Sequence, residues 1–330
     1  MPAKSALRRR QVIAAATLVA AAPEVATAAR PAADIVAEEF WVTKGAVRLY
    51  VYRKRMRAGP ARRPVLFLVH GSSFSGRGGF DLQVPGHPGY SMMDEFAGHG
   101  FDVWTMDHEG YGRSTRTESN SDVASGMADL AAAFPLVEQA TGAKALMVYG
   151  QSSGALRAGA YAMAAPERFE RLVLDAFTYT GEGAPEIMRR RAEAATYRAN
   201  AHRPMTRASF TAVFSRDDPS TFEPAMATAL ADYELALGDT APSGTYLDMA
   251  VNMPKVDPKR VACPVLITRA ATDGNATEAE LFDFFAQLPN RDKQFAMLRG
   301  VAHVAVLGTN RARVFHVMRE FLTYPPLHAA

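Results

Sequence analysis

Cysteine is almost absent from the 330-residue chain, in which Cys263 is the only one. An intramolecular disulfide is therefore excluded, even in an oxidising compartment. Cys263 comes directly before the apolar run PVLITRA, so we expect it to be a small buried residue of the core. Beyond the N-terminal segment, no apolar run is long enough to span a bilayer, and we expect no membrane span in the rest of the chain.

The first 28 residues have the pattern of an export signal. MPAKSALRRR is basic, QVIAAATLVAAA is apolar, and an Ala-x-Ala sequence ends at Ala28. Arg9 and Arg10, followed by Gln-Val-Ile, fit a twin-arginine signal, although Arg8 stands where Ser or Thr is usual and the apolar run also suits ordinary secretion. We therefore expect an exported, periplasmic protein. The alternative is a frayed alanine-rich helix.

Net charge is also absent once the expected signal is set aside. The chain has 37 basic and 34 acidic residues, and the signal holds four of the former and one of the latter, which leaves 33 of each. The basic character thus belongs mostly to the signal. Neither a nucleic acid nor an anionic membrane surface is expected as a partner.

Short, nearly continuous apolar runs recur along the chain, bounded by Gly, Pro and Asp. Such runs suit strands buried on both faces of a parallel sheet, and helical patterns lie between most of them. We therefore expect an α/β fold with a mostly parallel, doubly wound sheet. Residues 38–55 alternate apolar and polar side chains around Lys44 and Gly45, which predicts an antiparallel hairpin before that sheet. The predicted sheet strands are residues 65–71, 101–107, 145–150, 171–177, 264–270 and 294–300.

Two helices are predicted near the C-terminal end. Residues 277–289 open with a capping box, Thr277 and Glu280, and residues 310–322 gather their apolar side chains on one face. A further interval contains only helix-like pieces and no convincing strand, and it is too long for a crossover between two strands. We interpret it as an inserted helical lid over an active site, the alternative being a helical layer with no gating role. The expected plan is an export signal at 1–28, a core at 29–177 and 259–330, and the lid at 178–258.

The stretch VYGQSSGAL contains a Gly-x-Ser-x-Gly motif between an apolar run and a helical pattern. That context is the one required of a nucleophile elbow, in which a reactive serine sits on a tight strand-to-helix turn. The turn needs small residues two positions before and after the nucleophile. Centring it on Ser152 places Gly150 and Gly154 there, whereas centring it on Ser153 places the bulky Gln151 there. Ser152 is therefore the predicted nucleophile.

A serine hydroxyl needs a base to take its proton, and the base needs an orienting acid. Asp273 and His303 each come just after a predicted strand. Both therefore fall in loops at the carboxyl ends of strands, where open parallel sheets build their sites. We expect His303 to be the base and Asp273 the acid. The alternatives are a surface-loop histidine and an aspartate that caps the following helix.

With these residues, the chain resembles the α/β-hydrolases over roughly residues 40–322, in the chain order Ser152, Asp273, His303. HGSS after one strand and DHEGYGRS after the next strengthen the resemblance. A serine at the elbow argues against the haloalkane dehalogenases and epoxide hydrolases of this fold. The resemblance implies an oxyanion hole made by the backbone N–H groups of Ser72 and Ser153. It also makes Asp175 a rival acid, because some members carry the acid after that strand.

The resemblance further implies acyl transfer: a serine hydrolase that cleaves a carboxylic ester or lactone of a small, largely apolar molecule through an acyl-enzyme. An amide or a carbon–carbon bond is the alternative, since HGSSFSG resembles the loop of meta-cleavage-product hydrolases, and a non-catalytic binding homologue is a third. We expect no cofactor, and the spacing of the histidines predicts no metal. Arg157 is expected to be a solvated or salt-bridged helix residue, the alternative being a residue that binds a substrate carboxylate. The candidates for an apolar pocket, which are equally candidates for packing, are Ser73, Phe74, Phe177 and Tyr179.

Overall fold

The computed structural model describes residues 34–325, so the export signal expected at residues 1–28 lies outside the described part. One sheet of eight strands forms the centre, in the order β1-β2-β4-β3-β5-β6-β9-β10. The pairs β1–β2 and β2–β4 are antiparallel, and all the other neighbours are parallel. The predicted mostly parallel sheet is therefore confirmed. The strands are β1 (Ile35–Lys44), β2 (Val47–Met56), β3 (Val65–Val69), β4 (Asp102–Met106), β5 (Leu146–Gln151), β6 (Phe169–Asp175), β9 (Val265–Ala270) and β10 (Lys293–Leu298).

The parallel strand β3 is apolar throughout because both of its faces are buried. In β3, Leu66 and Leu68 belong to the core cluster on one face of the sheet, and Val65, Phe67 and Val69 to the cluster on the other. Successive side chains of a strand point to opposite faces, so a five-residue apolar run fills two cores at once. A continuous apolar run, with no alternation, is the pattern that this burial requires.

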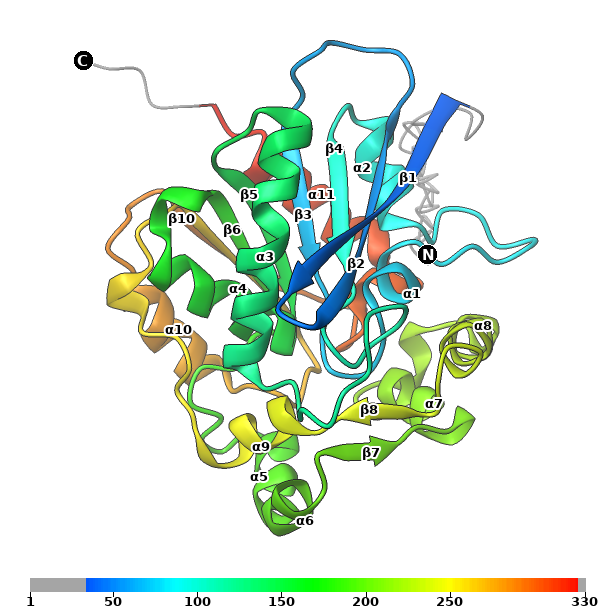
Figure 1. The fold of residues 1–330 in the computed structure, drawn as a ribbon. Helices are drawn as coiled ribbons and strands as arrows, with labels where there is room; N and C mark the ends of the chain where they lie inside the picture. Colours follow the sequence, from blue (N-terminus) through cyan, green and yellow to red (C-terminus); the bar gives the residue numbers. More distant parts are fainter. Residues whose placement is uncertain (1–33, 326–330) are drawn as a thin grey trace, which may run out of the picture. The chain divides into compact units, whose positions relative to one another are not determined.

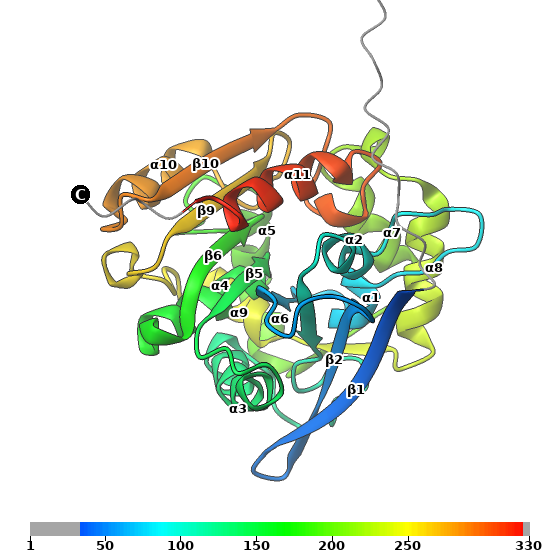
Figure 2. The ribbon, with the colours of Figure 1, turned by 90° about the horizontal axis from the view of Figure 1, so that it is seen from above.

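Helices cover both faces of the sheet. Viewed along the strands in Figure 2, α2 and α11 lie on one side and α3 on the other. The capping box expected before α10 is present, since the Thr277 side chain accepts from the Glu280 N–H and the Glu280 side chain accepts from that of Thr277. The helices of the first face are α1 (Gly76–Phe80), α2 (Met92–Gly98) and α11 (Arg311–Leu322), and those of the second are α3 (Val123–Thr141), α4 (Ser153–Ala164) and α10 (Glu278–Gln287).

A largely helical insertion separates β6 from β9 and lies at one end of the sheet (Figure 1). It also contains a small antiparallel pair, β7 (His202–Pro204) with β8 (Thr240–Pro242). The expectation of no strand in this interval is therefore wrong. Each strand has three residues and ends in proline, which is too short to show an alternating pattern. The helices of the insertion are α5 (Pro185–Ala192), α6 (Ala194–Ala199), α7 (Arg207–Ser215), α8 (Pro224–Leu235) and α9 (Gly244–Val251).

Three expectations about composition bear on the described residues. Cys263 is a buried free thiol, as predicted. Between residues 34 and 325, no helix is both long enough and apolar enough to cross a membrane. In the same part of the chain, no group of three or more His, Cys, Asp or Glu side chains is arranged to hold a metal ion.

Candidate active site

Ser152 occupies the sharp turn between β5 and α4, with φ 56° and ψ −123°. A positive φ is unusual for a residue with a side chain and costs about 1–3 kcal/mol, so the surrounding structure must hold it in place. The Ser152 N–H donates to the carbonyl of Asp175 at the end of β6, 2.8 Å away. A Cβ on Gly150 would lie 2.6 Å from the Cα of Ala155, and one on Gly154 would collide with the backbone of Val69. Both flanking glycines are therefore sterically required.

The loops after β9 and β10 bring Asp273 and His303 to this turn. Nε2 of His303 lies 3.1 Å from Oγ of Ser152, and its Nδ1 lies 2.9 Å from Oδ2 of Asp273. Asp273 and His303 are buried, whereas Ser152 is partly exposed. The structure thus joins the three residues in one hydrogen-bonded chain, with the serine at the accessible end.

The Asp273 carboxylate is held in its ionised form. Burial by itself raises its pKa, but the charge and hydrogen bond of His303, the charge of Arg216 and the N–H of Asn275 outweigh burial and bring the pKa to about 2. The Asn275 N–H donates to Oδ1 at 2.9 Å. Asp273 is therefore a permanent negative charge at neutral pH, next to the imidazole.

The rival acid, Asp175, has other partners. It accepts a hydrogen bond of 2.7 Å from the hydroxyl of Tyr149 and another of 2.7 Å from that of Thr268. Burial raises its pKa to about 6, although both hydrogen bonds oppose the shift. Of the two carboxylates, Asp273 makes the hydrogen bond to His303, so the geometry favours Asp273 as the acid.

The two residues expected to form the oxyanion hole lie side by side. The Ser72 hydroxyl donates to the Ser153 hydroxyl at 2.6 Å and lies 2.7 Å from the hydroxyl of Thr245 in α9. The preceding residue, Gly71, is so close to the nucleophile that a Cβ there would lie 3.3 Å from Cβ of Ser152. The structure therefore brings both predicted donors to the elbow. Their role toward an oxyanion stays a prediction.

The four pocket candidates have different surroundings. Ser73 is partly exposed and borders a small cavity of about 10 Å³, next to Met205 and Phe210 of the insertion. Phe74 is buried in the core cluster beside α1. The rings of Phe177 and Tyr179 lie 4.8 Å and 5.2 Å from that of Phe284 in α10. Phe74, Phe177 and Tyr179 therefore pack against other side chains of the protein. Contact of any of the four candidates with a substrate stays a prediction.

Arg157 differs from the expectation of a solvated or salt-bridged residue. Its side chain is fully buried, donates to the carbonyl of Ser121 at 2.9 Å and stacks over the ring of Tyr111. It makes no ion pair with any carboxylate of residues 34–325. His70 is buried and accepts the backbone N–H of His108 at 3.0 Å.

A group that the sequence did not reveal lies beside the oxyanion loop. The guanidiniums of Arg190 in α5 and Arg203 in β7 lie 4.5 Å and 4.1 Å from the ring centre of Tyr246 in α9. Ser73, next to Ser72 in the loop after β3, is one of the side chains that lower the pKa of Tyr246. In the sequence, Arg190 is one of three consecutive arginines in a polar helical segment. That pattern is typical of a solvated helix face, so the sequence does not predict that Arg190 is buried against Tyr246.

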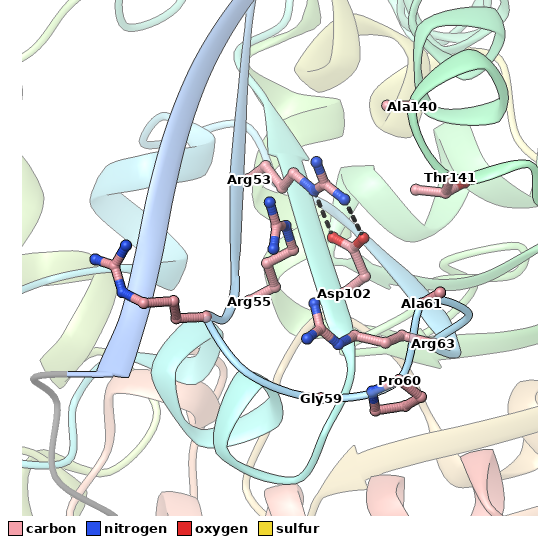
Figure 3. A pocket seen from close by; sticks show the side chains of 10 residues that line it. Arg53, Arg55, Gly59, Pro60, Ala61, Arg63, Asp102, Ala140 and Thr141 are labelled. Atoms are coloured by element: carbon pink, nitrogen blue, oxygen red, sulfur yellow. Dashed lines mark hydrogen bonds and ion pairs between the residues drawn. The ribbon is translucent and has the colours of Figure 1, made fainter.

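A larger cavity, of about 320 Å³, lies at the opposite end of the sheet, where β4 begins (Figure 3). Arg53 occupies its wall and binds Asp102 with two hydrogen bonds, 2.8 Å and 2.5 Å long. Ser152, His303 and Asp273 lie instead beyond the carboxyl ends of the strands. This cavity is therefore separate from the candidate active site.

The sheet order, the elbow and the loops at its carboxyl end define an α/β-hydrolase. The sequence belongs to the family described as serine aminopeptidase S33, whose model matches residues 90–308. No curated protein sequence matches the chain.

Among solved structures, the chain is similar to the enol-lactonase from Burkholderia xenovorans LB400, at 16% identity and a TM-score of 0.61, over 86% of this chain and 99% of that one. A thermophilic esterase from Thermogutta terrifontis is 18% identical, with a TM-score of 0.61 over 86% and 98% of the two chains. The 2-hydroxy-6-oxo-6-phenylhexa-2,4-dienoate hydrolase from Rhodococcus sp. strain RHA1 is 18% identical, with a TM-score of 0.59 over 87% and 99%. At these identities the likeness shows the fold.

Proposed function

We propose that the protein is a serine hydrolase that cleaves a carboxylic ester or lactone through an acyl-enzyme. The observation that carries the proposal is the hydrogen-bonded chain from Ser152 through His303 to Asp273, with distances of 3.1 Å and 2.9 Å. Membership of a hydrolase family supports it.

In the proposed reaction, Oγ of Ser152 attacks the carbonyl carbon while Nε2 of His303 takes the hydroxyl proton. Asp273, ionised at neutral pH, stabilises the imidazolium that forms and holds Nδ1 as the donor. The N–H groups of Ser72 and Ser153 stabilise the oxyanion, and loss of one such donor typically lowers the rate about 10²- to 10³-fold. His303 then gives its proton to the departing alcohol, and a water activated by the same residue releases the acid.

The insertion is proposed to act as a lid. Thr245 of α9 contacts Ser72, and Arg203 of β7 donates to the Ser72 carbonyl. Residues of the insertion thus touch the oxyanion loop directly, as a segment that closes an active site must do. Export to the periplasm is the corresponding proposal for the location of the enzyme.

A fluorophosphonate probe followed by peptide mapping tests the mechanism. Covalent label on Ser152 of the wild type, and none on Ser152→Ala, is the expected result. Folded protein that takes no label would favour the binding homologue, and label on Ser153 would overturn the assignment of the nucleophile.

A substrate panel separates the kinds of bond. 4-Nitrophenyl esters and lactones are compared with an aminoacyl anilide and with a vinylogous diketone, which is cleaved at a carbon–carbon bond. Turnover of esters or lactones well above the other two is expected. Preferred turnover of the anilide or the diketone would replace the ester proposal by one of the alternatives.

A further inference from the structure

The group of Arg190, Arg203 and Tyr246 spans the space between two loops of the proposed catalytic centre. On one side, Arg203 donates to the backbone carbonyl of Ser72 in the oxyanion loop. On the other side, Arg216, which follows α7, donates to Oδ1 of Asn275 at 2.8 Å, two residues after Asp273. Positive side chains of the insertion therefore lie between the oxyanion loop and the acid loop.

The positive charges in this group are unequally neutralised. Arg216 forms ion pairs with Asp217 at 3.2 Å and Glu186 at 3.4 Å. Arg190 and Arg203 have no carboxylate within ion-pair distance among residues 34–325, and Arg203 donates only to the backbone carbonyls of Ser72 and Pro242.

Arg190 is the more unusual of the two. Its side chain is 1% exposed, its Nη1 donates only to the sulfur of Met249 at 3.2 Å, and its Nε has no partner. Burial lowers the pKa of Arg190, although the charge of Tyr246 opposes the shift. A buried charge without an ion-pair partner costs several kcal/mol, and the phenol of Tyr246, which lies against Arg190, offsets this cost only in part.

The group is partly accessible to solvent. Ser73, Arg203, Tyr246 and the nucleophile Ser152 are all partly exposed, and only Arg190 is enclosed. Because Arg203 is partly exposed and neither guanidinium has an acidic partner, a carboxylate fits the site by charge.

We infer that Arg190, Arg203 and Tyr246 form a subsite for a carboxylate carried by the substrate. The inference rests on the proposed function and narrows it: the preferred substrate is an ester that bears a free carboxylate in its acyl or alcohol part. The two arginines bind the carboxylate, and the Tyr246 and Ser73 hydroxyls complete its hydrogen bonds while the ester carbonyl reaches Ser152.

Matched substrates test the inference. Two pairs of 4-nitrophenyl or alkyl esters are used, one with a terminal carboxylate in the acyl chain and one with it in the alcohol, each against the carboxamide of equal length. In at least one pair, kcat/KM of the wild type is expected to favour the carboxylate about tenfold to a hundredfold, the value of a charge-assisted hydrogen bond. No preference for the carboxylate in either pair would overturn the inference.

Variants assign the preference to the group. Arg190→Gln and Arg203→Gln are each expected to reduce the carboxylate-to-carboxamide ratio about tenfold or more. Arg190→Lys, which keeps a charge, retains part of that ratio. The matched control is Arg189→Gln, because Arg189 is exposed and pairs with Glu186 and Glu193. If the carboxylate-to-carboxamide ratio is unchanged in both glutamine variants, the two arginines do not bind the carboxylate. If Arg190→Gln does not fold, Arg203→Gln alone provides this test.

Calorimetric binding of glutarate to the catalytically inactive Ser152→Ala distinguishes failure of the subsite from failure of the proposed function. Binding that weakens about tenfold on adding Arg190→Gln supports the subsite even if no ester is hydrolysed. Ester hydrolysis with Ser152 labelled, but no glutarate binding and no carboxylate preference, would leave the proposed function standing and remove the subsite.

Discussion

The hydroxyl of Ser72 donates a hydrogen bond of 2.6 Å to the hydroxyl of Ser153. This bond ties the loop after β3 to the first turn of α4, and it gives the second serine of the elbow a structural partner. The Ser153 side chain is fully buried, whereas Ser152 is partly exposed and lies 3.1 Å from His303. We therefore expect the two adjacent serines to have separate tasks.

Ser153→Ala and Ser152→Ala separate these tasks. Ser153→Ala keeps the backbone N–H and removes only the hydroxyl, so we expect it to retain substantial activity, with a loss of about tenfold or less from the broken hydrogen bond. Ser152→Ala removes the nucleophile and should abolish turnover. Steady-state hydrolysis of a 4-nitrophenyl ester measures both, and the reverse ranking would show that Ser153 is the nucleophile.

Asp273→Asn should lower kcat by roughly 10³- to 10⁴-fold, because an amide no longer holds His303 in the tautomer that accepts the serine proton. Asp175→Asn is the matched control: an amide at that position can still meet the Tyr149 and Thr268 hydroxyls, which rotate to donate or accept. We expect Asp175→Asn to keep kcat within about tenfold and to change mainly the thermal stability. A larger loss of kcat in Asp175→Asn than in Asp273→Asn would reassign the acid.

The sequence predicted the sheet and the grouping of Ser152, Asp273 and His303 because each rests on a local pattern. Strands buried on both faces are apolar runs, and the loops that follow parallel strands meet at one edge of the sheet. In contrast, β7 and β8 are too short for any periodicity. The group around Tyr246 depends on how α5, β7 and α9 pack together, which no local pattern in the sequence records.

The burial of Arg157 also has no local signal in the sequence. A single arginine in a helix is usually solvated, so burial was not expected. Its position over Tyr111 is possible because Gly126 of α3 leaves room, where a Cβ would collide with the guanidinium. The cause lies in another helix, 31 residues earlier in the sequence.

Tyr246 should ionise near neutral pH. Burial by itself raises its pKa, but the charges of Arg203 and Arg190, the nearby side chain of Ser73 and the charge of Arg216 lower it to about 7. The ring of Tyr197, from α6, also faces it, and that phenol has a pKa raised to about 12. Ultraviolet difference titration should therefore show one tyrosinate forming near pH 7, about three units below the ordinary value of 10.0.

Tyr246→Phe should remove this transition, and Tyr197→Phe should keep it. A carboxylate bound between the two arginines replaces part of the negative charge of the tyrosinate. Glutarate should therefore raise the apparent pKa of Tyr246 in the same titration. If no tyrosine ionises below its ordinary range, the charges around Tyr246 are more strongly screened than the structure implies.

Glu234 of α8 makes stability depend on pH. Its carboxyl is buried and accepts from the backbone N–H of Ser75 at 2.9 Å and from the Ser75 hydroxyl at 2.6 Å. Burial raises its pKa to about 7, with a further contribution from the charge of Asp107, although the Ser75 bonds oppose the shift. Between the ordinary value of 4.5 and 7, the folded protein keeps a proton that the unfolded chain has released. The contribution of Glu234 to stability is therefore full below about pH 4.5 and is lost as the pH rises through 7.

Glu234→Gln should remove this dependence, since the amide oxygen can accept the same bonds and cannot ionise. Relative to the wild type, the variant should gain free energy of unfolding between pH 4.5 and pH 8, by an amount on the order of 3 kcal/mol. Urea unfolding of both proteins at the two pH values measures the gain. Glu118→Gln, at an exposed position, is the control for the substitution itself. If the free energies of unfolding of wild type and Glu234→Gln differ by the same amount at both pH values, Glu234 has the same pKa in the folded and unfolded chains. Water would then reach the contact between α8 and the loop after β3 and solvate the carboxylate.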